Sequence, residues 1–208
     1  MSSTVHRKAV AYEDLVSVPD HLVAEILDGE LFTSPRPAFR HARAASMLGA
    51  NVMGRFDGPG GGGGESPGGW WLLFEPELHF DRDVIVPDIA GWRRDRVPEL
   101  PDAPWFDVAP DWVCEVISPT TESIDRGRKL RIYAREGVSH LWLLNPVPKT
   151  LEVYRLADSN WVLENTLVGD EVIHAEPFAA VGMQMSRWWL PEAPPKSKTE
   201  SKARAIEL

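Results

Sequence analysis

The centre of the chain contains the stretch Trp112-Val113-Cys114-Glu115-Val116-Ile117-Ser118, an apolar run with a single carboxylate in its middle. Valine, isoleucine and tryptophan favour extended backbone, so the run is typical of a buried β-strand. Ser118-Pro119-Thr120 then ends this strand. Glu115 is therefore expected inside a sheet, where an ionised carboxylate without a partner is strongly disfavoured.

The segments on either side of this strand alternate between helix-like and strand-like patterns. Apolar residues recur at helical spacing from Ala38 to Phe56, and a second helical stretch from Ser123 to Glu136 ends at Gly137. Further strands are predicted at 71–80, 84–92, 138–144, 149–156, 161–168 and, more briefly, 171–174. This order of elements predicts a single α/β domain over residues 1–190.

The N-terminal part of the chain carries a turn signal at Asp28-Gly29, between Leu22–Leu27 and Leu31-Phe32. Both central residues of a type I′ turn need positive φ, so Asp-Gly between apolar segments favours a β-hairpin. A helix over 23–27 that ends at Gly29 is the alternative interpretation. Residues 12–18 are expected to form a short helix or turn that ends before Pro19.

The composition restricts the classes of function. The 208 residues carry a net charge of -9, which argues against a protein that coats nucleic acid through many Lys and Arg contacts. The charge is compatible with an enzyme that binds one phosphate at a metal, because carboxylates are ligands of hard divalent cations. The single cysteine, Cys114, suits a reducing cytoplasm, and no apolar run reaches the roughly 20 residues of a membrane span.

Two segments have compositions typical of chain without fixed structure. Gly58 to Gly69 is nearly all glycine and is predicted to be a flexible loop. Pro191 to Leu208 is rich in Lys, Ser, Pro and Ala and is predicted to be a disordered tail. Trp188-Trp189, just before this tail, is a candidate surface patch for a partner.

A second carboxylate occupies a position like that of Glu115. Asp88 follows Val84-Ile85-Val86-Pro87 and is followed by Ile89-Ala90, so it is also expected in the sheet interior. Two buried carboxylates in nearby strands require a compensating cation. A single Mg²⁺ or Mn²⁺ shared by both carboxylates would supply this charge, because both ions prefer hard oxygen ligands.

A lysine is expected to complete this site from the following helix. Lys129 lies in that helix, where Arg126 and Tyr133 share its face at spacings of three and four. An ammonium near a metal can polarise the attacking water or neutralise charge that builds on a phosphate. Two acids and a lysine therefore predict a phosphoryl-hydrolysis site without a covalent nucleophile.

Motifs in the same order characterise a known family. They are Glu25-Ile26-Leu27-Asp28-Gly29-Glu30-Leu31, His41, Val86-Pro87-Asp88-Ile89, Pro110 to Thr120, Asp125 to Lys129, Tyr133, and Gly137 to Pro146. With these residues the chain resembles the Uma2 family (DUF820), bacterial proteins of the PD-(D/E)XK nuclease superfamily. The resemblance runs from about Tyr12 to Leu156.

The resemblance implies a restriction-endonuclease-like core, with a mixed central β-sheet flanked by helices and with added N-terminal and C-terminal β-hairpins. It also implies metal-dependent cleavage of DNA, with Asp88 and Glu115 as metal ligands and the backbone carbonyl of Val116 as a third. In one place the chain departs from the superfamily pattern, because Ile117 stands where a lysine is expected. Lys129 would then supply the ammonium from the next helix.

Several residues near these motifs allow more than one interpretation. Glu25 either adds a carboxylate to the site or flanks the hairpin, and His41 is interpreted as a structural histidine in preference to a general base. Tyr133 is an accessory candidate. Contact with the DNA backbone is expected from Arg126, Arg128 and Arg131. For Lys129, which lies in the same basic run, a place on a solvated helix face is the alternative.

Two functions from different classes follow from these observations. The first is a Mg²⁺-dependent or Mn²⁺-dependent endodeoxyribonuclease, with DNA as the partner. The second is a catalytically inactive nuclease fold that binds DNA or a protein. Hydrolysis of another phosphodiester at the same centre is a third reading, and a homodimer would suit an enzyme that cuts two strands.

Overall fold

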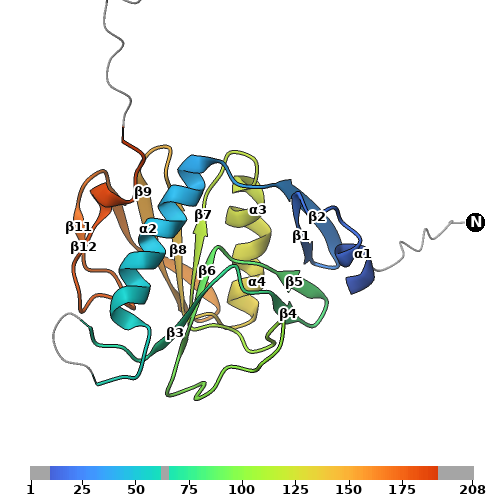
Figure 1. The fold of residues 1–208 in the computed structure, drawn as a ribbon, viewed down its shortest axis with the longest axis horizontal. Coiled ribbons are helices and arrows are strands. Elements are labelled where there is room, and N and C mark those ends of the chain that lie inside the picture. Colours follow the sequence, from blue (N-terminus) through green and yellow to red (C-terminus); the bar gives the residue numbers. More distant parts are fainter. Residues whose placement is uncertain (1–9, 62–65, 192–208) are drawn as a thin grey trace, which may run out of the picture.

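A six-stranded mixed sheet forms the centre of the fold (Figure 1). The computed structural model describes residues 10–61 and 66–191. The strand order is β10-β9-β8-β7-β6-β3, and only the β7–β8 pairing within this sheet is parallel. The strands are β3 (Trp70–Phe74), β6 (Ile89–Arg93), β7 (Trp112–Val116), β8 (His140–Asn145), β9 (Thr150–Ala157) and β10 (Asn160–Val168). The predicted mixed α/β fold is confirmed.

Helices cover both faces of this sheet (Figure 1). Helix α2 (Phe39–Phe56) packs on the face that receives Trp112, Cys114 and Val116 of β7. Helix α4 (Leu130–Arg135) packs on the opposite face with Val113. Successive strand residues point to opposite faces, so Glu115 is directed towards α4. Because side chains alternate between the two faces of β7, only the helix on the α4 side can supply a hydrogen-bond or ion-pair partner to Glu115.

A smaller sheet with the order β2-β1-β5-β4 carries the N-terminal hairpin. Its strands are β1 (Leu22–Leu27), β2 (Glu30–Pro35), β4 (Leu78–Phe80) and β5 (Asp83–Ile85), and helix α1 (Tyr12–Val16) precedes them. Asp28 and Gly29 have φ values of 54° and 74°, as a type I′ turn requires. The predicted hairpin is therefore confirmed, and the alternative helix is wrong.

Two strands predicted as continuous are each divided between the two sheets. The stretch 71–80 breaks into β3 and β4, because Glu75 turns to a φ of 44° and Pro76 follows it. The stretch 84–92 breaks into β5 and β6 around Pro87, which has no N–H to donate to a strand ladder. Asp88 therefore lies in the connection between the sheets, and the expectation that it is embedded in a strand is wrong.

The second helical stretch is continuous but irregular. It consists of α3 (Glu122–Ile124), a π-helical turn η1 (Asp125–Lys129) and α4. Turns of π-helix are rare and often occur at functional sites. Both end residues of η1, Asp125 and Lys129, are buried. Gly137 has a φ of 78° and ends the helix as predicted.

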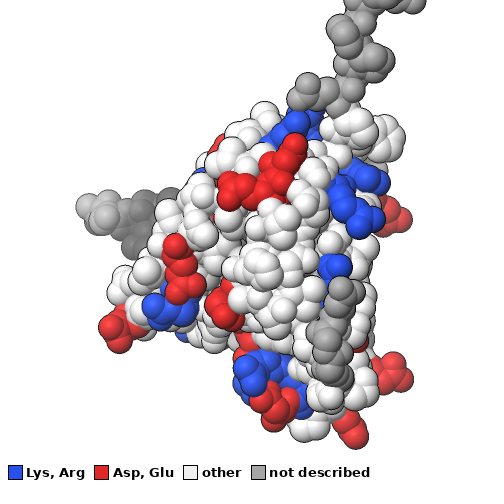
Figure 2. Space-filling view, turned by 90° about the vertical axis from the view of Figure 1, so that its left-hand side faces the viewer, with Lys and Arg blue, Asp and Glu red and all other residues white. Residues whose placement is uncertain are grey.

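The C-terminal part of the described chain closes over the α2 face. It contains β11 (Val172–Ile173), β12 (Met183–Gln184) and the 3₁₀ turn η2 (Met185–Arg187). Trp188 and Trp189 are buried in the core there, with Phe178 at the centre of the same cluster, so the prediction of a surface patch is wrong. Figure 2 shows this side of the molecule, where acidic and basic residues form small groups among uncharged ones.

Of the two segments predicted to be unstructured, the tail lies outside the described residues except for Pro191, whereas the glycine-rich segment lies outside them only at residues 62–65. The described ends of the glycine-rich segment are bonded to each other, because the N–H of Gly69 donates to the carbonyl of Gly58 at 2.8 Å. No described helix is both long and apolar enough to span a bilayer.

Gly91 in β6 is expected to tolerate no side chain. A Cβ there would lie 2.8 Å from Leu72 Cδ2 and 3.3 Å from Trp70 Cε3, and both of these residues are buried. We expect Gly91→Ala to lower the free energy of unfolding by about 1–3 kcal/mol through overpacking. Urea denaturation measures this. Gly54→Ala is the control, because nothing lies within 4 Å of its Cβ, and it should raise stability by about 0.5–1 kcal/mol. Equal effects of the two changes would refute the packing argument.

Candidate active site

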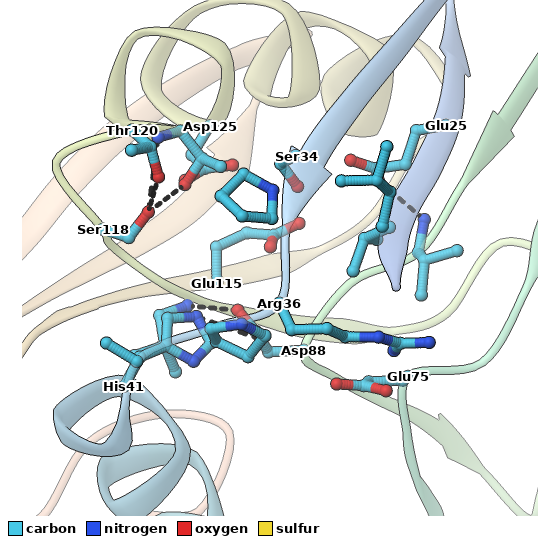
Figure 3. A pocket seen from close by; sticks show the side chains of 18 of the residues that line it. Glu25, Ser34, Arg36, His41, Glu75, Asp88, Glu115, Ser118, Thr120 and Asp125 are labelled. Carbon is cyan, nitrogen blue, oxygen red and sulfur yellow. Dashed lines mark hydrogen bonds and ion pairs between the residues drawn. The ribbon is translucent and has the colours of Figure 1, made fainter. Parts of the chain in front are cut away.

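A cavity of about 480 Å³ lies where the two sheets meet the first turn of α2 (Figure 3). Its walls come from β1, the end of β2, the Val86–Asp88 connection, the end of β7 and η1. The carboxylates that line it belong to Glu25, Glu75, Asp88, Glu115 and Asp125. Lys129 and His41 line it as well. The fold thus brings Asp88, Glu115 and Lys129 into one cavity, although they lie on three separate elements.

Asp88 is held by two donors. Its Oδ2 accepts the backbone N–H of Val116 at 2.7 Å. Its Oδ1 lies 3.3 Å from Nε2 of His41, which reaches it from the first turn of α2. The bond to Val116 ties the connection between the sheets to the end of β7. It places Asp88 beside the backbone unit that follows Glu115.

Lys129 forms the buried centre of the site. Its Nζ lies 2.8 Å from Glu115 Oε1 and 3.0 Å from Glu25 Oε1, and it donates to the carbonyl of Val86 at 3.1 Å. These three acceptors match the three N–H bonds of an ammonium group. The side chains of Lys129 and Glu115 are only 4% and 3% exposed. Glu25 therefore belongs to the site, and it also accepts the N–H of Val86 at 2.8 Å.

Tyr133 supports Glu115 from the next turn of the helix. Its hydroxyl donates to Oε1 of Glu115, and both groups are buried. This oxygen also contacts Lys129, so a single carboxylate oxygen receives the phenol and the ammonium together. The arrangement fixes the rotamer of Glu115.

The acids outnumber the bases in this cavity, and the pKa values respond accordingly. Burial raises the pKa of Glu115 well above its usual value, although Lys129 opposes the shift. Burial also raises the pKa of Asp125 to about 6. For Lys129 burial lowers the pKa, but Glu115 and Glu25 raise it by more, so the net shift is upward. Lys129 is therefore a permanent cation at neutral pH.

His41 responds to Asp88 in a similar way. Burial lowers the pKa of His41, but the contact with Asp88 raises it by more, and the net shift is upward. Its Nδ1 is buried and has no hydrogen-bond partner among the described residues. The sequence interpretation treated His41 as structural, whereas the fold places its Nε2 against a carboxylate of the cavity.

The arginines predicted to contact DNA lie outside the cavity lining. Arg126 donates to both oxygens of Glu152, at 2.8 and 2.6 Å, and to Glu122 at 2.9 Å. Arg128 lies 3.0 Å from Glu30. Arg131 is exposed. Arg126 and Arg128 are thus engaged within the chain, and only Arg131 of the three is presented to solvent without such an ion pair among the described residues.

The fold brings two further residues to this cavity for which no role was predicted from the sequence. Asp125 stands four residues before Lys129 and accepts the hydroxyl of Thr121 at 2.7 Å. The spacing of four to Lys129 was the signal for it. Arg36 also lines the cavity, as Asp88 and Glu75 do, and nothing local marks it, because it only follows a strand in the sequence (Figure 3).

The donor groups fit a magnesium-type cation. Among the described residues no group of three or more His, Cys, Asp or Glu side chains is close enough to hold a metal by itself. Mg²⁺ usually keeps several waters and binds through one or two carboxylates, so a full protein cage is not required. Asp88, Glu115 and the Val116 carbonyl are the oxygens that would hold it. Burial raises the pKa of Glu115, and a bound cation would favour its ionised form.

Comparisons with known proteins agree with this architecture. The structure of a DUF820 protein from Anabaena variabilis ATCC 29413, titled a putative nuclease, superposes with a TM-score of 0.65 at 20% sequence identity. The match covers 87% of this chain and 99% of that one, and it shows a shared fold. No curated protein matches the chain. The profile of the Uma2 family, described as "Putative restriction endonuclease", matches residues 10–187, and the chain therefore belongs to this family.

Proposed function

We propose that the protein is an endonuclease that hydrolyses DNA phosphodiester bonds with a Mg²⁺-activated or Mn²⁺-activated water. The observation that carries this proposal is that Asp88, which accepts the N–H of Val116, and Glu115, against which Lys129 is buried, line the same cavity. Membership of a family described as restriction endonucleases supports the reaction class. The excess of carboxylates supports the need for a divalent cation.

Each residue has a role that follows from its contacts. Asp88, Glu115 and the carbonyl of Val116 would hold the cation. When bound, such an ion lowers the pKa of a coordinated water and neutralises charge on the phosphate. Lys129 supplies a fixed positive charge beside Glu115, and Tyr133 holds that carboxylate in one orientation. His41 is a further proton carrier at the cavity, because its Nε2 faces Asp88.

A catalytically inactive nuclease fold that binds DNA or a protein is the second candidate. It is favoured by the commitment of Lys129 to three acceptors, which leaves its ammonium with no N–H for a water or phosphate. Calorimetric titration with Mn²⁺ separates the two candidates. The endonuclease requires binding that depends on Asp88, whereas an inactive fold has no need for a metal site.

Asp88→Asn is expected to lower the rate of supercoiled-plasmid nicking by about 100-fold or more, because it removes a ligand charge. The amide oxygen can still accept the N–H of Val116, so the fold should be preserved. Nicking is measured with Mg²⁺ and with Mn²⁺. The matched control is Asp81→Asn, an exposed turn aspartate outside the cavity, whose activity should equal that of the wild type. Equal nicking by all three proteins would discard this metal site.

A further inference from the structure

The first turn of α2 presents an unusual group of exposed side chains at the edge of the candidate active site. Phe39 is 89% exposed, the highest value among the exposed large hydrophobic residues of the described chain. It stands between Ala38 and His41, both of which line the cavity. Arg36 and Arg40 flank it and are exposed as well. Three exposed residues within five positions, one aromatic and two basic, therefore lie next in sequence to residues that line the cavity.

Arg36, which precedes α2, and Arg40 in its first turn are available for an anionic partner. Neither Arg36 nor Arg40 forms an ion pair among the described residues, and the first turn of α2 contains no acidic residue. Arg36 makes one hydrogen bond, to the backbone carbonyl of Asp20 at 3.0 Å. By contrast, Arg126 and Arg128 are bound to carboxylates of the chain. The described part of the face in Figure 2 likewise offers no broad basic area.

A second cavity, of about 240 Å³, continues from the active site along the same side of α2. It is lined by Ala42 and Ser46 of the helix, by Phe74 at the end of β3, and by Asp88, which is shared with the larger cavity. Phe39 precedes Ala42 by three residues, so the two residues lie on the same face of the helix. Phe74 is 47% exposed. Phe39 thus lies one helical turn before Ala42, on the helix face that borders a hollow reaching Asp88, although its own side chain lines neither cavity.

These features suit one kind of polymer. An unpaired nucleic-acid strand offers phosphates to arginine and a free base face to an aromatic ring, and such stacking is tolerant of sequence. In a continuous duplex the base faces are occupied by their neighbours, so an exposed ring on the surface gains little from it. A positively charged groove with a stacking platform is the usual design of proteins that bind single strands.

We propose that the first turn of α2 binds an unpaired strand, with Phe39 stacked on a base and with Arg36 and Arg40 on the phosphates around it. The substrate class is then DNA with a single-stranded stretch, such as a free end or a fork, next to the phosphate that is cut. This inference rests on the proposed nuclease function for the cutting step, but the strand-binding surface is defined independently of it.

The binding test uses fluorescence anisotropy of a labelled single-stranded oligonucleotide and of its duplex, in EDTA so that no cleavage occurs. Phe39→Ala should weaken single-strand binding by about 5- to 100-fold and leave duplex binding unchanged. Phe39→Trp, which retains a ring, should bind like the wild type. Arg36→Gln and Arg40→Gln should each lower the slope of log affinity against log salt by about 0.7. Single-strand binding that is insensitive to Phe39→Ala, or no binding by the wild type, would overturn the proposal.

A cleavage assay with Mg²⁺ distinguishes a failure of the strand-binding proposal from a failure of the nuclease proposal. We expect the wild type to cut a forked duplex faster than a fully paired duplex of the same sequence, and Phe39→Ala to lose that preference. If the wild type binds single strands through Phe39 but cuts neither substrate, the nuclease proposal fails while the binding surface stands. If it cuts both substrates equally, the substrate class proposed here is wrong and the nuclease function stands.

Discussion

Lys129→Met is expected to lower plasmid nicking by about 100- to 1,000-fold, the usual effect of removing one preorganised charge from an active site. The ammonium of Lys129 is the only lysine charge within the described cavity lining, and it contacts both Glu115 and Glu25. Methionine fills a similar volume without charge. The loss should appear in the rate of the first nick with Mg²⁺ and also with Mn²⁺.

The same change is expected to cost stability, which requires a control. Removing one partner of a buried ion pair typically costs about 3–5 kcal/mol, because the remaining charge is left in an apolar environment. The double variant Lys129→Met with Glu115→Gln removes both charges and should recover much of this stability in urea denaturation. It should not recover nicking. Recovery of activity in the double variant would mean that neither the charge of Lys129 nor that of Glu115 is needed for catalysis, and that Lys129 acts only on folding.

Asp125→Asn is expected to raise the free energy of unfolding at pH 7 by up to about 3 kcal/mol, since one pKa unit corresponds to about 1.4 kcal/mol. Burial raises the pKa of Asp125 from 3.8 to about 6, so the folded state binds this proton more tightly than the unfolded state. The stabilisation from that proton is complete below pH 3.8 and is lost as the pH rises through about 6. At neutral pH the folded protein therefore holds an unfavourable charge that asparagine removes.

Urea denaturation of wild type and Asp125→Asn from pH 4 to pH 8 tests this sign. The difference in stability between the two proteins should be small at pH 4 and should increase up to about pH 7. The hydroxyl of Thr121 can still donate to the amide oxygen, so the local geometry should be preserved. A difference that is constant across the pH range would show that Asp125 titrates at its ordinary pKa.

The candidate site was predictable where local rules applied. The alternation in β7 places Glu115 on the face of α4, and the spacing of four between Lys129 and Tyr133 places both on the helix surface that meets it. Glu25 remained ambiguous, because its contact with Lys129 joins residues that are 104 positions apart. Such a contact depends on how the hairpin sheet sits against the helix, which no short stretch specifies.

The pairing of two arginines and the burial of two tryptophans also could not be predicted from the sequence. Arg126 and Arg128 resemble a basic helix face in the sequence, but the sheet brings Glu152 and the hairpin brings Glu30 against them. Trp188 and Trp189 precede a polar tail and resemble a surface patch, yet they complete the core over α2. Residue type alone could not separate these outcomes, because burial and pairing depend on the distant segments that a residue meets.

Short stretches of sequence were enough to predict the hairpin turn at Asp28-Gly29, the two faces of β7 and the end of the helix at Gly137. Each of these depends on the backbone preferences or the side-chain period of a few neighbouring residues. The division of a strand between two sheets at Pro87 and the contact between His41 and Asp88 became visible in the folded chain alone. Hydrogen-bond partners and burial are set by which surfaces pack together, and packing joins elements that are far apart in the chain.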